Sequence, residues 1–254
     1  MKILLTGSDG FIGTHLKREL SKRHTMILVE RDSDWAWVES AVSNCDVVVH
    51  QGAITDTMNY DVNDMMTQNF DVSKFIFDRA YDKKIIYASS AACYGPKSIY
   101  AWSKYCAEQY GLYRCNNFIA LRYFNVYGPG EEHKGAMASI AYQAMKKNSM
   151  ELFPKFPKRD FVYIDDVVNV NLYALEHDVM SGVYDVGTAE ARTFERVCDI
   201  LEIPCSYRDE ADIPKHYQHY TKADSDKWLP GWTPKYSLEE GLKDYEDYFH
   251  KRLF

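Results

Sequence analysis

The chain has 254 residues, of which 46% are hydrophobic, so it can bury a large core as one domain or as two smaller lobes. Its net charge of -7 argues against a basic surface of the kind that binds nucleic acid or anionic membranes. The sequence shows neither a signal-peptide pattern nor an apolar run long enough to span a membrane. The six cysteines have no metal-ligand spacing, so we expect reduced thiols, no metal site and a cytoplasmic location.

Short apolar runs alternate along the chain with segments of helical periodicity. The expected elements, in chain order, are a strand at 2–6, a helix at 11–23, strands at 26–30 and 47–50, a helix at 63–79, a strand at 85–88, a helix at 100–115, a strand at 118–121, and helices at 137–147, 165–177, 193–201 and 237–251. Asp165, Thr193 and Ser237 are expected to start the last three helices. The alternation predicts an α/β fold with a Rossmann-like, doubly wound parallel sheet. After Tyr127 the rhythm becomes irregular, which indicates a smaller C-terminal lobe.

A glycine-rich segment, TGSDGFIG at residues 6–13, follows the first strand and opens the first helix. Gly7, Gly10 and Gly13 stand three residues apart, which permits a tight turn and lets backbone N–H groups approach a pyrophosphate. This order predicts that the three glycines, with Phe11 and Ile12 between them, bind a dinucleotide.

The residues at the end of the second strand leave the choice of dinucleotide open. Glu30 has the spacing of an acidic residue that binds the adenosine ribose hydroxyls, which favours NAD. Arg31 follows directly and could instead hold the additional phosphate of NADP.

Three residues in YASSAACYG (87–95) and YAWSK (100–104) suit proton transfer to and from an alcohol. Tyr100 and Lys104 are four residues apart, so on a helix they project from the same face. A neighbouring ammonium and a cationic nicotinamide both favour the phenolate form of Tyr100, which makes it a usable base. Ser90, at the carboxyl end of a strand, is expected to bind the reacting oxygen, and we also expect Tyr100 and Lys104 to contact the cofactor.

Together these strings resemble the extended short-chain dehydrogenase/reductases, and the resemblance covers nearly the whole chain. It implies Ser90, Tyr100 and Lys104 as a catalytic triad and Asn125 of RYFNVYGP as a substrate contact.

A narrower resemblance, to the ADP-L-glycero-D-manno-heptose 6-epimerase family, rests on several further strings. These are QGAITDT (51–57), MMTQNFDVSK (65–74), RYFNVYGPGEEHKGAMAS (122–139), KRDFVYIDDVVNVNL (158–172) and YQHYTKAD (217–224). The resemblance implies Lys134 as a second acid/base opposite the tyrosine. It further implies Gln51 and Asn69 as cofactor contacts, His133 and Tyr217 as substrate contacts, and Arg159 as a diphosphate clamp.

The expected organisation is a dinucleotide-binding domain at 1–128 and 160–187 and a substrate lobe at 129–159 and 188–254. The expected function is an epimerase that oxidises one carbon of a nucleotide-diphosphate sugar and re-reduces it on the opposite face, with tightly bound NADP or NAD. An ADP-heptose is the favoured substrate; a UDP-sugar 4-epimerase or a nucleotide-sugar reductase are the alternatives. A non-catalytic dinucleotide sensor is disfavoured because Tyr100 and Lys104 are present. We expect a homo-oligomer with neither nucleic acid nor membrane as partner.

Two segments are shorter than the resemblance implies. Only nine residues separate Ser90 from Tyr100, and the span from Arg31 to Asp46 has no clear third strand. We therefore expect a more open sugar site and a less enclosed adenine.

Overall fold

The computed structural model describes residues 1–57, 59–134, 139–214 and 217–253, without the side chains of His133, Arg252 and Leu253. These residues form two compact units. Unit 1 contains Met1–Arg122, Val168–Tyr184 and Leu229–Trp232, and unit 2 contains Tyr123–Val167, Asp185–Trp228 and Thr233–Phe254. Contacts thus change from one unit to the other after Arg122, six residues before the expected boundary at 128, and return at Val168 instead of residue 160.

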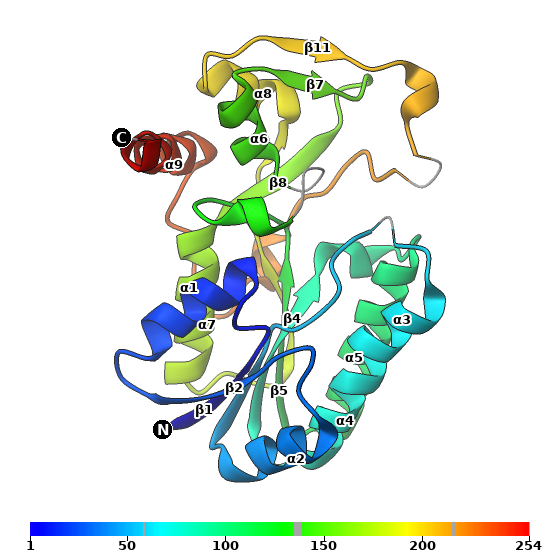
Figure 1. Ribbon diagram of the computed structural model, residues 1–254, viewed down its shortest axis with the longest axis vertical. Coiled ribbons are helices and arrows are strands. Elements are labelled where there is room, and N and C mark those ends of the chain that lie inside the picture. The colour runs from blue at the N-terminus through cyan, green and yellow to red at the C-terminus, as the bar shows by residue number, and fades with distance from the viewer. Residues whose placement is uncertain (58, 135–138, 215–216, 254) are drawn as a thin grey trace. The chain divides into compact units, whose positions relative to one another are not determined.

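A parallel sheet forms the centre of unit 1 (Figure 1). Its strands, in spatial order, are β2 (Thr25–Val29), β1 (Lys2–Thr6), β3 (Val47–His50), β4 (Lys84–Ser90), β5 (Asn117–Tyr123) and β9 (Gly182–Val186). Strand β1 pairs in parallel with both β2 and β3, so the direction of winding reverses between β1 and β3. In open parallel sheets, ligands bind where this reversal leaves a crevice at the carboxyl ends of the strands. The predicted Rossmann-like fold is confirmed.

Helices cover both faces of this sheet (Figure 1). They are α1 (Phe11–Leu20), α2 (Trp35–Asn44), α3 (Val62–Met66), α4 (Val72–Arg79), α5 (Ile99–Arg114) and α7 (Ile164–Glu176). The side covered by α2, α4 and α5 contains a continuous core that includes the fully buried Leu4, Val48, Phe77 and Phe118. Burying each such side chain contributes about 1.5–3 kcal/mol, so this core fixes the strands whose ends carry the predicted site.

Several elements differ from the sequence-based expectation. Helix α2 was not expected, although Asp34 caps it by accepting the Trp37 N–H and its buried residues Val38, Ala41 and Val42 have helical spacing. Strand β2 ends at Val29, so Glu30 follows the strand. Asp165 lies within the first turn of α7 and does not precede the helix.

Among its described residues, unit 2 contains two small sheets and three α-helices. The strands are β6 (Asn125–Tyr127), β8 (Lys158–Tyr163) and β10 (Ala191–Thr193) in one sheet and β7 (Met150–Leu152) and β11 (Cys205–Tyr207) in the other; the helices are α6 (Ile140–Lys147), α8 (Phe194–Ile200) and α9 (Leu238–Leu253). Thr193 caps α8 by accepting the Arg196 N–H, as predicted. At the start of α9, the Ser237 N–H donates to the Glu240 side chain and the Glu240 N–H donates to the Ser237 side chain, which is a capping box. Within the described part of the chain, every helix is too short or too polar to cross a membrane.

Candidate active site

The glycine loop between β1 and α1 leaves no room for a side chain at Gly7 or Gly13. Gly7 has a left-handed φ of 65°, and a Cβ on Gly13 would lie 1.9 Å from the Gly7 carbonyl oxygen. Gly10 caps α1 without a side chain, so the backbone N–H groups at the helix start, at Phe11, Ile12 and Gly13, are not covered by a capping side chain. Such a helix start attracts a phosphate, and the loop therefore fits the pyrophosphate of a dinucleotide.

Glu30 and Arg31 point to different partners. The Ser8 N–H donates to Glu30 Oε1 at 2.9 Å, which holds the carboxylate against the glycine loop. The Arg31 side chain is exposed and its Nη2 donates to Asp64 Oδ1 at 3.0 Å, on α3. The acidic group therefore lies at the loop, while the basic group is held by a carboxylate elsewhere on the surface.

The loop after β3 is held in place by buried polar groups. Thr6 Oγ1 accepts the Gly52 N–H at 2.8 Å, and Gln51 Nε2 donates to Asn171 Oδ1 at 3.3 Å. Asn69 is fully buried in a π-helical turn (Thr67–Asp71), where it accepts the Ile54 N–H at 2.7 Å and donates to the Ile54 carbonyl at 2.9 Å. The Asn69 amide thus shapes the loop that carries Gln51.

Ser90, Tyr100 and Lys104 lie at the junction of β4 and α5. Ser90 is the last residue of β4, and α5 starts where Ser98 accepts the Ala101 N–H at 3.1 Å. This cap begins the helix two residues before Tyr100 and so sets the direction of both Tyr100 and Lys104. Unit 1 therefore brings the predicted triad to the carboxyl end of a central strand.

The electrostatics of this junction oppose the charged forms of both titrating groups. Burial raises the pKa of Tyr100 to about 12, although its hydrogen bond with Ser90 opposes the rise. Burial lowers the pKa of Lys104 to about 8, and its Nζ lies 4.2 Å from the centre of the Tyr87 ring. Burial also raises the pKa of the Cys93 thiol, which indicates an inert group. Tyr100 thus needs further positive charge before it can act as a base.

The buried carboxylate of Glu108, which the sequence analysis does not single out, connects β4, α5 and β5 at this junction. Glu108 is fully buried and accepts from Ser89 Oγ at 2.6 Å and from Arg122 Nε and Nη2 at 2.9 and 2.6 Å. It therefore joins the residue before Ser90 to the helix of Tyr100 and to β5. The spacing could have indicated Glu108 as a member of the site, since it stands four residues after Lys104 and shares its helix face.

Arg159 of unit 2 is a buried cation. It lies in β8 with 7% of its surface exposed, and its guanidinium is 5.1 Å from the Tyr217 ring centre and 5.7 Å from that of Phe194. Its Nη1 donates to the Lys158 carbonyl at 3.0 Å, but no described carboxylate lies within ion-pair distance. A buried guanidinium without a carboxylate suits an anionic ligand, and the structure brings the predicted Arg159 and Tyr217 together.

Asn125 and Lys134 meet at strand β6. Asn125 begins this strand and pairs with Phe161 of β8, two residues from Arg159. Lys134 Nζ donates to the Val126 carbonyl at 2.7 Å and lies 3.7 Å from Glu131 Oε2, so its ammonium is held beside the strand that carries Asn125. The predicted contact through the His133 side chain and residues 135–138 of the HKGAMAS string fall outside the described part.

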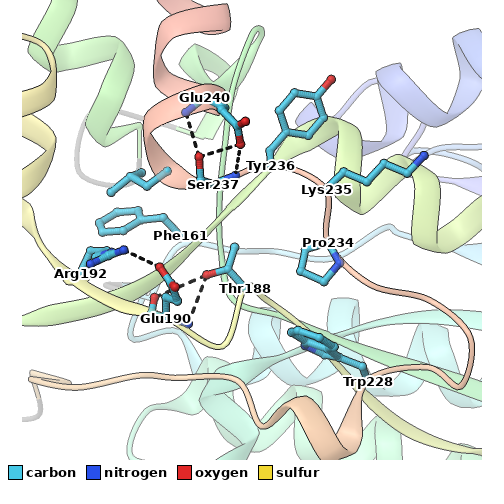
Figure 2. Close-up of a pocket in the computed structure, with 11 residues that line it drawn as sticks. Phe161, Thr188, Glu190, Arg192, Trp228, Pro234, Lys235, Tyr236, Ser237 and Glu240 are labelled. Atoms are coloured by element: carbon cyan, nitrogen blue, oxygen red, sulfur yellow. Dashed lines mark hydrogen bonds and ion pairs between the residues drawn. The ribbon is translucent and has the colours of Figure 1, made fainter.

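Unit 2 also contains a pocket of about 350 Å³ that the sequence did not indicate (Figure 2). Its labelled lining includes Phe161, Trp228 and Tyr236, with the ion pair of Arg192 and Glu190 at one side. None of the predicted site residues is among the described residues that line it. Among its polar lining groups, Arg192 pairs with Glu190 and Ser237 hydrogen-bonds to Glu240.

Comparison with known proteins gives consistent results. The NAD dependent epimerase/dehydratase family matches residues 3–187. The ADP-L-glycero-D-manno-heptose-6-epimerase of Fusobacterium nucleatum is 32% identical over an alignment of 319 positions, which covers 96% of this chain and 96% of that protein. Because the alignment is longer than the 254-residue chain, the relative contains segments that are missing here.

Two solved structures are similar over nearly their whole length. The ADP-L-glycero-D-manno-heptose-6-epimerase of Helicobacter pylori has a TM-score of 0.83 at 27% identity, covering 98% of this chain and 96% of that one. The UDP-glucose 4-epimerase of Thermotoga maritima, solved with UDP-glucose, has a TM-score of 0.83 at 25% identity and covers 100% of each chain.

Proposed function

The chain belongs to the NAD dependent epimerase/dehydratase family, and from this premise we propose that it inverts carbon 6 of an ADP-linked heptose. The observation that carries the proposal is the partly buried Lys134, whose ammonium donates to the Val126 carbonyl, in addition to Tyr100 and Lys104 on α5. A reductase needs one proton donor, whereas an epimerase needs proton transfer for each of two hydroxyl orientations. Two acid/base groups therefore favour epimerisation.

The proposed reaction assigns separate tasks to the residues of the site. A bound dinucleotide supplies the hydride acceptor and returns the hydride. Tyr100 takes the hydroxyl proton in one orientation, with Lys104 favouring its phenolate and Ser90 binding the sugar oxygen. Lys134 donates a proton to, or accepts it from, the oxygen in the other orientation. There is no net redox change, because the hydride that leaves the sugar returns to it, and the proton that Tyr100 takes is balanced by the proton that Lys134 donates.

Arg159 is the proposed site of the substrate diphosphate. Its guanidinium is buried against Tyr217 and Phe194 and has no described carboxylate partner, so a phosphoryl group would supply the missing counter-charge. Asn125, on the neighbouring strand, is the proposed sugar contact. Gln51 and the glycine loop are the proposed contacts of the dinucleotide.

NAD is the proposed cofactor in preference to NADP. Glu30 lies against the glycine loop, where its charge would repel a 2′-phosphate, and Arg31 is already paired with Asp64. We expect the protein to bind NADH about tenfold or more tightly than NADPH. Glu30→Gln, which keeps an acceptor for the Ser8 N–H, should bring the two affinities close together, as measured by calorimetric titration. Asp32→Asn removes a nearby exposed charge and should leave the preference intact; equal binding of both dinucleotides by the wild type would contradict the assignment.

The proposed function is tested by incubating the protein with ADP-heptose and with UDP-, GDP- and dTDP-sugars, first as purified and then with added NAD. Proton NMR should show inversion of the ADP-heptose without a net change in nicotinamide absorbance, and Lys134→Met should abolish it. Inversion of a UDP-sugar alone would establish the 4-epimerase alternative, which the likeness to the Thermotoga maritima enzyme favours. Consumption of NADH by a keto-sugar without any epimerisation would identify a reductase and remove the role of Lys134.

A further inference from the structure

Glu131, in the short helix Glu131–Lys134, is a fully buried carboxylate with two different partners. Its Oε1 accepts the N–H of Tyr142, in the first turn of α6. Ser139 precedes that helix but makes no side-chain cap, so Glu131 supplies from a distance the acceptor that the helix start requires. One oxygen of Glu131 is thus fixed by the fold.

The second oxygen of Glu131 is directed to Lys134. Oε2 lies 3.7 Å from Lys134 Nζ and accepts no hydrogen bond from the described residues. The same Nζ donates to the Val126 carbonyl at 2.7 Å, and the Lys134 side chain is 22% exposed. The ammonium therefore has a carbonyl and a carboxylate as partners within the protein, and the side chain that carries it is partly exposed.

Lys134 is the described cation that interacts with the Glu131 carboxylate. The carboxylate also interacts electrostatically with Glu132 on its own helix, Tyr127 on β6 and Tyr245 on α9, none of which carries a positive charge. Burial raises the pKa of Glu131 to about 7 and lowers the pKa of Lys134, while the opposite charges partly restore both. Each member thus depends on the other to remain charged.

We propose that Glu131 is a positioning residue that fixes the Lys134 ammonium against strand β6 and keeps it protonated between turnovers. This inference rests on the proposed role of Lys134 as the second acid/base. Lys134 would transfer one proton to the sugar oxygen, become a neutral amine, and regain a proton from solvent, while Tyr100 releases to solvent the proton that it took from the hydroxyl. Glu131 serves as the counter-charge of the ammonium form, and no reactant other than solvent protons is required.

The competing explanation is that Glu131 only caps α6. Glu131→Gln separates the two, because the amide keeps an acceptor for the Tyr142 N–H and loses the charge that faces Lys134. Glu132→Gln is the matched control, since it removes the same charge from the adjacent residue. The readout is the pH midpoint of Lys134 acetylation by acetic anhydride, followed by mass spectrometry, together with the pH profile of turnover.

We expect the Lys134 midpoint to fall by about 1–3 pH units in Glu131→Gln, the range for loss of an opposite charge at this distance, and to change little in Glu132→Gln. The alkaline limb of turnover should move in the same direction, with a lower kcat and a nearly unchanged KM. An unchanged midpoint and profile would overturn the proposal and leave Glu131 as a cap. If Glu131→Gln does not fold, Glu131→Asp should lower the Lys134 acetylation midpoint by a smaller amount. An unchanged midpoint in Glu131→Asp would then overturn the proposal.

The acetylation readout also separates this inference from the proposed function. A shifted midpoint in a protein that epimerises no sugar would retain the pairing of Glu131 with Lys134 and reject the epimerase. Normal epimerisation with an unshifted midpoint would retain the epimerase and reject the pairing.

Discussion

Tyr100→Phe is expected to lower the turnover of the epimerisation by about 10²- to 10⁴-fold, the contribution typical of a positioned general acid or base. The substitution removes one oxygen from a partly buried ring at the start of α5, so the fold should be retained. It eliminates the group that exchanges the hydroxyl proton while it leaves the glycine loop and Arg159 untouched. Binding of dinucleotide and sugar should therefore change little, and the loss should appear in kcat.

The measurement is the initial rate of inversion by proton NMR, with dinucleotide affinity from calorimetry. Tyr113→Phe provides the control, because it removes the same oxygen from an exposed position near the other end of α5. Full turnover in Tyr100→Phe would mean that another group is the base. Loss in both variants would indicate a general weakening of α5.

Glu108→Ala is expected to lower the free energy of unfolding by about 3–5 kcal/mol, because it leaves the largely buried guanidinium of Arg122 without its carboxylate partner. The Arg122 side chain is only 12% exposed, and Ser89 would also lose its acceptor. Urea unfolding followed by circular dichroism would measure the cost. The control is Glu239→Ala, which breaks the exposed pair with Arg196 and should cost about 1 kcal/mol or less.

A double variant identifies what the Glu108 network contributes to the reaction. Glu108→Leu combined with Arg122→Met replaces the ion pair by apolar groups and should recover most of the stability. If turnover stays low in this stable variant, the network is needed to hold Ser90 and Lys104 in place. Stability within about 1 kcal/mol of wild type in Glu108→Ala would contradict the structural role.

The cofactor half of the site was readable because its residues are close in sequence. Gly7, Gly10 and Gly13 occupy one strand-to-helix turn, and Tyr100 and Lys104 occupy one helix face, so the spacing alone predicts their relation. Helix α2 could also have been found, because Asp34 and the spacing of Val38, Ala41 and Val42 are ordinary helix signals.

Long-range polar contacts could not be read in this way. The sequence predicts Asn69 as a cofactor contact, and only the packed structure shows that its amide hydrogen-bonds both backbone groups of Ile54 and so supports the loop that carries Gln51. Whether a buried carboxylate is paired likewise depends on which strand or helix end lies next to it. Glu108 joins β4, α5 and β5, and no spacing along the chain predicts that Arg122 is its partner.

The sequence by itself thus determined the alternation of strands and helices, the glycine turn, the catalytic triad as a candidate set and the family resemblance, since these depend on local periodicity and short spacings. Only the tertiary structure decided which group each acidic side chain faces: the glycine loop for Glu30, Arg122 for Glu108, and Lys134 for Glu131. The physical reason is that burial and distance set the strength of a charge, and both arise only when segments far apart in the chain pack together.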